Sequence, residues 1–165
     1  MKKIIDLDIT KCSACGACAV ACMDQNDLDI TAGVSPFRVV KDLEETCGCY
    51  DYYSIACFHC EDAPCIDACP CNCLKKDEET GFTVYDNTKC IGCHSCAMAC
   101  PFGAPSYNTE GKMIKCDGCA ERVKHGLEPA CVNNCATGAL RLLEEVDLED
   151  IGAERSLYKK MKGLK

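Results

Sequence analysis

The chain of 165 residues contains no tryptophan, and only four phenylalanines and six tyrosines supply aromatic side chains. Because aromatic residues dominate ordinary cores, this composition is thin for one large hydrophobic core. No segment approaches the roughly 18 consecutive apolar residues of a membrane-spanning helix. The first segment has no apolar signal-peptide core, since Asp6 and Asp8 interrupt it, and no twin-arginine pair precedes the first cysteine. These absences predict a cytoplasmic chain without a membrane span.

Positive charge is also scarce. The formal net charge is −8 at pH 7, which argues against nucleic acid as a partner, because proteins that bind nucleic acid present a basic face. The sequence also lacks a Ser–His–Asp arrangement, a glycine-rich phosphate loop and a pair of carboxylates suited to acid–base chemistry. We therefore predict no catalytic site, and we expect that the chain is not an enzyme by itself.

Cysteine, by contrast, is abundant, with 20 residues in the chain. This content indicates either a disulfide framework or metal sites. Disulfides persist in oxidising compartments, and nothing in the sequence indicates export, so metal binding is the favoured interpretation. Metal clusters would also replace part of the hydrophobic core, as metals do in small folds.

Sixteen cysteines fall into four groups, each of which begins with Cys-x2-Cys and ends with Cys-x3-Cys. The groups are Cys12, Cys15, Cys18 and Cys22; Cys57, Cys60, Cys65 and Cys69; Cys90, Cys93, Cys96 and Cys100; and Cys116, Cys119, Cys131 and Cys135. The first and third have the C-x2-C-x2-C-x3-C spacing of bacterial ferredoxins, which bind [4Fe–4S] clusters. Three close thiolates can bind one cluster, while the fourth cysteine points away and binds the other cluster of the pair.

Glycines inside the cysteine loops support this interpretation. Gly16, Gly92 and Gly118 allow the backbone to approach a cluster closely, so that N–H groups can bond to its sulfur. The fourth group alone also fits a four-cysteine zinc site, and structural disulfides are a further alternative. His59 and His94 lie inside the loops and are expected beside ligands or at the surface, whereas His125 is expected in a surface loop.

Hydrophobic periodicity predicts short strands and short helices around the four groups. Ile5, Leu7 and Ile9 alternate with polar residues in the first strand. The expected strands are Lys3–Ile9, Phe37–Lys41, Phe82–Tyr85 and Ala139–Leu143, and the expected short helices are Ala17–Met23 and Ser95–Cys100. The tail Val146–Lys165 is expected to be helical, either packed on the body of the protein or serving as a docking element, although Gly152 weakens this prediction.

The four groups in this order resemble the iron–sulfur electron-transfer (B-type) subunits of the dimethyl sulfoxide reductase family, which includes formate dehydrogenases. The stretches that carry the resemblance are residues 57–65, 89–93, 100–108, 115–123 and 129–131. The resemblance implies an α+β fold of two bacterial-type 2[4Fe–4S] ferredoxin-like modules, one inserted within the other, with a C-terminal helix. The implied boundaries are 1–30 plus 110–145 for the first module, 50–109 for the second, 31–49 for an inserted β segment and 146–165 for the helical tail.

The resemblance also implies how the sixteen cysteines share four [4Fe–4S] clusters. The implied ligand sets are Cys12, Cys15, Cys18 and Cys135; Cys116, Cys119, Cys131 and Cys22; Cys57, Cys60, Cys65 and Cys100; and Cys90, Cys93, Cys96 and Cys69. Lysines precede the first cysteine of three groups, at Lys11, Lys89 and Lys115. A nearby cation would raise a cluster's potential, although an exposed lysine without this role is the alternative.

Four clusters have one plain use, the relay of single electrons. By the resemblance, the chain connects a large catalytic subunit of molybdenum or tungsten pterin type, such as a formate dehydrogenase or aldehyde oxidoreductase, with a second electron-transfer subunit. The alternatives are a free, diffusible polyferredoxin and a zinc-stabilised interaction module. The sequence does not identify the substrate of the complex, the partner's metal, the cluster potentials, the direction of electron flow or the assembly state.

Four cysteines, Cys47, Cys49, Cys71 and Cys73, belong to none of the groups. Three interpretations stay open: the four form a fifth metal site (a cluster or zinc), they include a redox-active disulfide, or Cys73 is a small buried apolar residue and the other three have no role. Residues 69–73 align with Cys100-Pro-Phe-Gly-Ala, so that Asn72 takes the place of a glycine. Because asparagine tolerates a positive φ better than most residues, we expect the turn to be kept.

Overall fold

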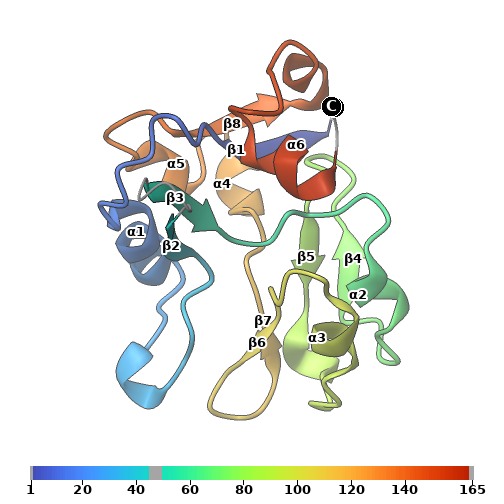
Figure 1. Cartoon of the computed structure of the whole chain (residues 1–165). Coiled ribbons are helices and arrows are strands. Elements are labelled where there is room, and N and C mark those ends of the chain that lie inside the picture. The colour runs from blue at the N-terminus through green and yellow to red at the C-terminus, as the bar shows by residue number, and fades with distance from the viewer. Residues whose placement is uncertain (1, 45–49, 164–165) are drawn as a thin grey trace.

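The computed structural model describes residues 2–44 and 50–163, so Cys47 and Cys49 lie outside the described residues. Short strands, several of them consecutive, are separated by short helices along the chain (Figure 1). The strands are β1 Lys3–Leu7, β2 Val39–Glu44, β3 Tyr50–Ile55, β4 Leu74–Lys76, β5 Thr83–Tyr85, β6 Ser106–Tyr107, β7 Met113–Ile114 and β8 Leu140–Glu144. The α-helices are α1 Ala17–Gln25, α2 Pro64–Asp67, α3 Ser95–Ala99, α4 Ala120–Lys124, α5 Ala130–Asn133 and α6 Leu157–Lys162. The 3₁₀ turns are η1 Ile30–Ala32, η2 Asn87–Lys89 and η3 Glu145–Leu148.

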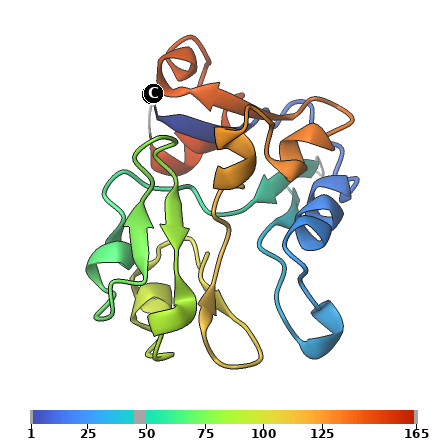
Figure 2. The ribbon, with the colours of Figure 1, turned by 180° about the vertical axis from the view of Figure 1, so that it is seen from behind.

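The strands form antiparallel pairs, and the pair β1–β8 joins segments from opposite ends of the chain. Lys3 lies opposite Glu144 and Leu7 lies opposite Leu140. Figures 1 and 2 show these strands and α6 together at one end of the molecule, with β4, β5, α2 and α3 at the other. The remaining pairs are β2–β3, β4–β5 and β6–β7. The strands expected from the sequence are therefore present, with ends shifted by a few residues.

The predicted short helices are also confirmed, because α1 and α3 begin at Ala17 and Ser95 as expected. Each follows a residue in the left-handed conformation, Gly16 with φ of 78° and His94 with φ of 62°. This conformation turns the chain sharply from a cysteine loop into the helix. The helices are too short to be stable alone, so their stability depends on what packs against them.

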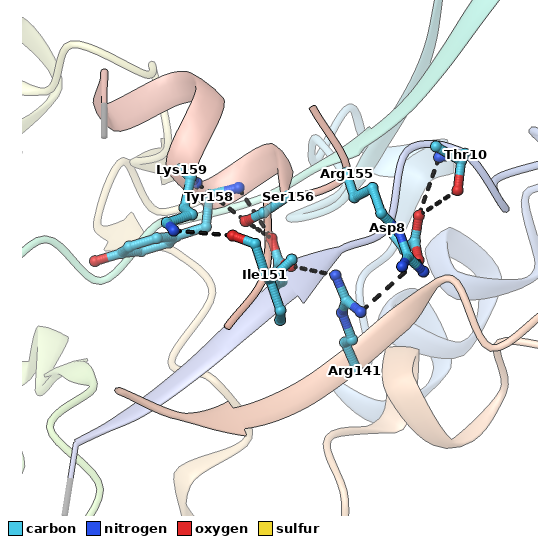
Figure 3. Close-up of polar contacts among 9 residues, drawn as sticks. Asp8, Thr10, Arg141, Ile151, Arg155, Ser156, Tyr158 and Lys159 are labelled. Carbon is cyan, nitrogen blue, oxygen red and sulfur yellow. Dashed lines mark hydrogen bonds and ion pairs between the residues drawn. The ribbon is translucent and has the colours of Figure 1, made fainter. Parts of the chain in front are cut away.

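The polar side of the first strand is buried, which the alternating pattern did not predict. Asp6 is 1% exposed and Asp8 is fully buried. Asp6 accepts hydrogen bonds from Arg141 Nη2 at 2.9 Å and from Ser156 Oγ at 2.9 Å. Arg155 Nη2 donates to Asp8 at 2.7 Å (Figure 3). Buried carboxylates are stable only when they are paired in this way, so these contacts fix the C-terminal segment onto β1.

The C-terminal helix is present but shorter than predicted. It spans Leu157–Lys162, whereas the expected continuous helix over 146–165 is wrong in extent. Ser156 caps α6 by accepting a hydrogen bond from the Lys159 amide, and its hydroxyl also binds Asp6. The preceding residues leave the helical path because they approach the buried carboxylates of β1. Leu157 and Tyr158 are buried in the main core, so α6 packs on the body of the protein.

Among the described residues, the hydrophobic core is divided into three clusters, and each one contains cysteines. The largest gathers residues of β1, β8, α5 and α6 around Cys18 and Cys131. The second contains Cys65 and Cys96, and the third contains Cys22 and Cys116. Thiol groups therefore occupy positions that apolar side chains hold in ordinary cores. Within the described residues, no helix combines the length and the apolar character that crossing a membrane demands.

Candidate metal centres

The four cysteine groups share one backbone feature. In each Cys-x2-Cys loop the residue before the second cysteine has a positive φ: Ala14 (54°), His59 (47°), Gly92 (66°) and Gly118 (76°). The turn aims a backbone N–H at the first cysteine, as the Gly92 amide shows at 3.5 Å from Cys90 Sγ. A Cβ at Gly92 would lie 2.7 Å from the Gly111 carbonyl oxygen, so this position requires glycine. The sequence pattern missed Ala14 and His59, because neither is a glycine.

One cavity is lined by cysteines from the first and fourth groups. The cysteines are Cys12, Cys15, Cys18 and Cys135. The Leu140 amide donates to Cys135 Sγ at 3.2 Å, and the Ser54 hydroxyl lies 3.2 Å from Cys18 Sγ. The structure thus brings together residues that are more than a hundred positions apart in the sequence, because the β1–β8 pair closes the chain on itself.

A second cavity is lined by cysteines from the second and third groups, together with two of the ungrouped cysteines. The grouped cysteines are Cys69, Cys90, Cys93 and Cys96, and the ungrouped ones are Cys71 and Cys73. The Met113 amide donates to Cys90 Sγ at 3.3 Å, and the Tyr107 hydroxyl lies 3.7 Å from Cys96 Sγ. The N–H donors favour a thiolate at these sulfurs, whereas burial raises the pKa of Cys96, so a thiolate at this position depends on a bound cation.

Two cysteines outside these cavities have strongly raised pKa values. Burial raises the pKa of Cys22 to about 12, and the neighbouring Cys131 and Cys119 contribute to this increase. Burial likewise raises the pKa of Cys65 to about 11, with Cys57 as the first contributing cysteine. Thiols with such high pKa values stay protonated at neutral pH unless a bound metal displaces the proton, so these places are unfavourable for free thiolates.

Cysteines of the fourth group lie beside cysteines of the first group. Cys135 lines the cavity with Cys12, whereas Cys131 lies beside Cys22. In residues 2–44 and 50–163, no three His, Cys, Asp or Glu side chains converge closely enough to hold a single metal ion. The zinc alternative for this group therefore finds no support.

Cys71 and Cys73 lie at the second cavity, where the predicted turn is confirmed. Asn72 has φ of 51° and the matching Gly103 has φ of 63°. The Cys73 amide donates to Cys69 Sγ at 3.3 Å. Cys73 is 3% exposed, and burial raises its pKa. This burial agrees with an apolar role, while a fifth site with Cys47 and Cys49 stays a prediction because those two residues are not described.

Two buried cations lie among the cysteines, and the sequence pattern did not single out the first. Arg38 is 4% exposed, and its Nη1 donates to the carbonyl and hydroxyl oxygens of Ser54 at 3.0 and 3.1 Å. Burial lowers the pKa of Arg38, but the nearby Cys131 and Cys116 sulfurs outweigh this and raise it. Among the described residues, no carboxylate lies within ion-pair distance of this guanidinium.

The second buried cation is Lys115, which is 1% exposed and donates to the carbonyl oxygens of Thr83 and Cys116. The structure therefore overturns the surface alternative for this lysine, whereas Lys11 and Lys89 are exposed. A buried cation without a carboxylate partner is costly unless another anion lies nearby. Cysteine sulfurs lie beside both cations, and as thiolates they can supply this negative charge.

The comparisons with known proteins agree with these centres. Residues 49–145 match the family model described as a 4Fe-4S dicluster domain. The chain is 44% identical over 145 residues to the B subunit of the anaerobic dimethyl sulfoxide reductase of Escherichia coli (strain K12), covering 81% of this chain and 69% of that protein. It is 38% identical over 146 residues to the corresponding subunit from Haemophilus influenzae, covering 81% and 69%. It is 32% identical over 174 residues to the iron–sulfur subunit of formate dehydrogenase-O of Escherichia coli (strain K12), covering 95% and 58%.

The chain therefore belongs to the family of iron–sulfur electron-transfer subunits of dimethyl sulfoxide reductase and formate dehydrogenase type. The resemblance inferred from the cysteine groups is thereby confirmed. A 4Fe-4S dicluster domain of ferredoxin type occupies more than half of the chain.

Proposed function

We propose that this chain relays single electrons through four [4Fe–4S] clusters, from a catalytic subunit to a second redox partner or in the reverse direction. The observation that carries the proposal is a pair of cavities, each lined by three cysteines of one group and one cysteine of another, with the ungrouped Cys71 and Cys73 also at the second. This crossover between groups is the ligand pattern of two-cluster ferredoxins. When bound, a [4Fe–4S] cluster accepts and donates one electron.

The proposed ligand sets are those that the family resemblance implies. Cys12, Cys15 and Cys18 act with Cys135, and Cys90, Cys93 and Cys96 act with Cys69; each set shares a cavity. Cys116, Cys119 and Cys131 act with Cys22, and Cys57, Cys60 and Cys65 act with Cys100. The effects of Cys131 and Cys119 on the pKa of Cys22, and of Cys57 and Cys100 on that of Cys65, support these two sets.

The residues around these sets fit an anionic cofactor. Four thiolates give a [4Fe–4S] centre a net negative charge, and Arg38 and Lys115 are buried beside cysteines without a described carboxylate partner. Backbone N–H groups are aimed at Cys57, Cys69, Cys90, Cys100 and Cys135. These donors stabilise negative charge on sulfur, which is what cluster ligands require.

We further propose two ferredoxin-like modules, one inserted in the other. Residues 1–30 and 110–145 would form the first module, and residues 50–109 the second, with 31–49 as an inserted β segment and 146–165 as the tail. The β1–β8 pair supports the first module because it joins the two ends of the chain. The β2–β3 pair joins the proposed inserted segment to the strand that begins at Tyr50, which supports a β character for this segment.

The named relatives are subunits of larger enzymes, which favours a dedicated subunit over a free polyferredoxin. The proposed partners are a large catalytic subunit of molybdenum or tungsten pterin type and a second electron-transfer subunit, in the cytoplasm. The chain itself would make no bonds, since its role is to hold the clusters and adjust their potentials.

Anaerobic purification from the native source under mild conditions tests this proposal. We expect about sixteen irons and sixteen sulfides per chain, as four [4Fe–4S] clusters require, with co-purification of a pterin-containing subunit. A colourless or zinc-loaded protein would contradict the relay. A chain that carries its clusters but elutes alone would favour the free carrier.

A further inference from the structure

The side chain of His59 lies between two cysteine groups that are far apart in the sequence. Its backbone N–H donates to Cys57 Sγ at 3.4 Å, and its ring Nε2 lies 3.7 Å from Cys116 Sγ. Under the proposed ligand sets, these two sulfurs bind different clusters, one in each module. His59 thus contacts one cysteine ligand of each of two proposed clusters.

The hydrogen bonds of the ring determine where its proton lies. The Thr83 amide donates to Nδ1 at 3.0 Å, so Nδ1 carries no hydrogen. A neutral imidazole has its single N–H on the other nitrogen, which here is Nε2. The N–H of Nε2 therefore faces Cys116 Sγ, at a distance that suits a hydrogen bond to sulfur.

The ring is held firmly in this position. His59 is 5% exposed, and its ring packs against that of Phe82 with centroids 4.7 Å apart. Lys76 Nζ donates to the His59 carbonyl oxygen at 2.9 Å, which fixes the backbone as well. A residue with φ of 47° that is not glycine carries some backbone strain, and such strain is common at functional positions.

We propose that His59 is a positioning residue that donates a hydrogen bond from Nε2 to the Cys116 thiolate and thereby raises the reduction potential of the cluster bound by Cys116. Reduction adds negative charge to the cluster and its thiolates. A donor aimed at sulfur therefore stabilises the reduced state more than the oxidised state. This inference rests on the proposed cluster-binding function. It gives His59, which lies between two ligand sets, a role in setting the potential of one cluster.

Two substitutions separate the donor to Cys116 from the acceptor for Thr83. His59→Asn keeps an acceptor near the Nδ1 position and tolerates the positive φ, but it removes the donor at Nε2. His59→Gln can place an amide N–H near the Nε2 position, but it leaves the buried Thr83 amide without its partner. His94→Asn is the matched control, because His94 also has a positive φ inside a cysteine loop, but its ring stacks on Tyr107.

The measurement is a redox titration followed by electron paramagnetic resonance, with iron content and melting temperature determined for each variant. For His59→Asn we expect about a tenfold change in the one-electron equilibrium constant of one cluster, which lowers its potential by about 59 mV. His59→Gln should restore that potential while it lowers the melting temperature. His94→Asn should leave the cluster bound by Cys116 unchanged.

Three results would overturn the inference. Unchanged potentials in His59→Asn at full iron content would show that the donor has no effect. Loss of the cluster in His59→Asn would show that the residue retains the ligand instead of adjusting the potential. If His59→Gln does not restore the potential at full iron content, the shift has a cause other than the loss of the N–H donor. An iron-free wild-type protein would instead refute the proposed function itself.

Discussion

Replacement of the buried Arg38 by glutamine is the sharpest test of the electrostatics of the relay. The guanidinium is 4% exposed, and no described carboxylate neutralises it. It binds Ser54 Oγ at 3.1 Å, and this hydroxyl lies 3.2 Å from Cys18 Sγ. Removal of the positive charge should destabilise the reduced form of the clusters nearest to it.

The two contacts that join Arg38 to Cys18 through Ser54 set the magnitude. They place the charge within about 6 Å of the sulfur, and at an effective dielectric constant of about 20 two unit charges at this distance interact by about 3 kcal/mol. That energy corresponds to about two decades in a one-electron equilibrium constant, or about 120 mV. The added electron spreads over the cluster and away from this sulfur. We therefore expect the reduction potential of the nearest cluster to decrease by about 50 to 100 mV in Arg38→Gln.

Potentiometric titration of the anaerobic protein measures the effect cluster by cluster. Arg38→Lys is the matched variant that keeps the charge, and its potentials should stay near those of the wild type. Lys41→Gln removes an exposed cation of the same segment, so its effect on the potentials should be small because of solvent screening. If Arg38→Gln has the same potentials as the wild type at full iron content, the assumption that solvent does not screen the Arg38 charge is refuted.

Three further predictions concern the cofactors and the fold. Removal of iron by a chelator under reducing conditions should abolish most of the far-UV circular dichroism signal, since cysteines take part in every core cluster; a native-like spectrum would contradict this. Asp6→Ala should destabilise the protein by about 3 kcal/mol in thermal or urea unfolding, because it leaves buried partners unpaired, whereas the exposed control Asp67→Ala should change little. The double variant Cys71→Ser/Cys73→Ser should keep the wild-type iron content if Cys69 is the ligand at that cavity, and a loss of about four irons per chain, the content of one [4Fe–4S] cluster, would show that the pair binds a cluster.

Much of the local structure could be predicted, because it depends on short-range patterns. The Cys-x2-Cys spacing fixes tight loops, and α1 and α3 begin at the expected residues. The match between residues 69–73 and 100–104 predicted the positive φ of Asn72 correctly. Chain geometry within a few residues determines these features, so the sequence alone is sufficient for them.

Features that depend on distant segments could not be read from local patterns. Alternation placed Asp6 and Asp8 on a polar side, but Arg141, Arg155 and Ser156 meet them from the other end of the chain. The tail leaves the helical path before α6 because Arg155 and Ser156 contact these two buried carboxylates. The exposed-lysine alternative was wrong for Lys115 because the strands around it cover its side chain.

The sequence by itself determined the class of cofactor, since sixteen cysteines in four ferredoxin-like groups specify iron–sulfur chemistry through ligand type and spacing. Only the tertiary structure decided what surrounds those cysteines. Arg38, Lys115 and His59 reach the cysteines through contacts between segments 16 to 57 residues apart or through backbone carbonyls buried by such contacts. Charge and hydrogen bonding act through space over a few ångströms, so the environment of each thiolate depends on folding and not on sequence proximity.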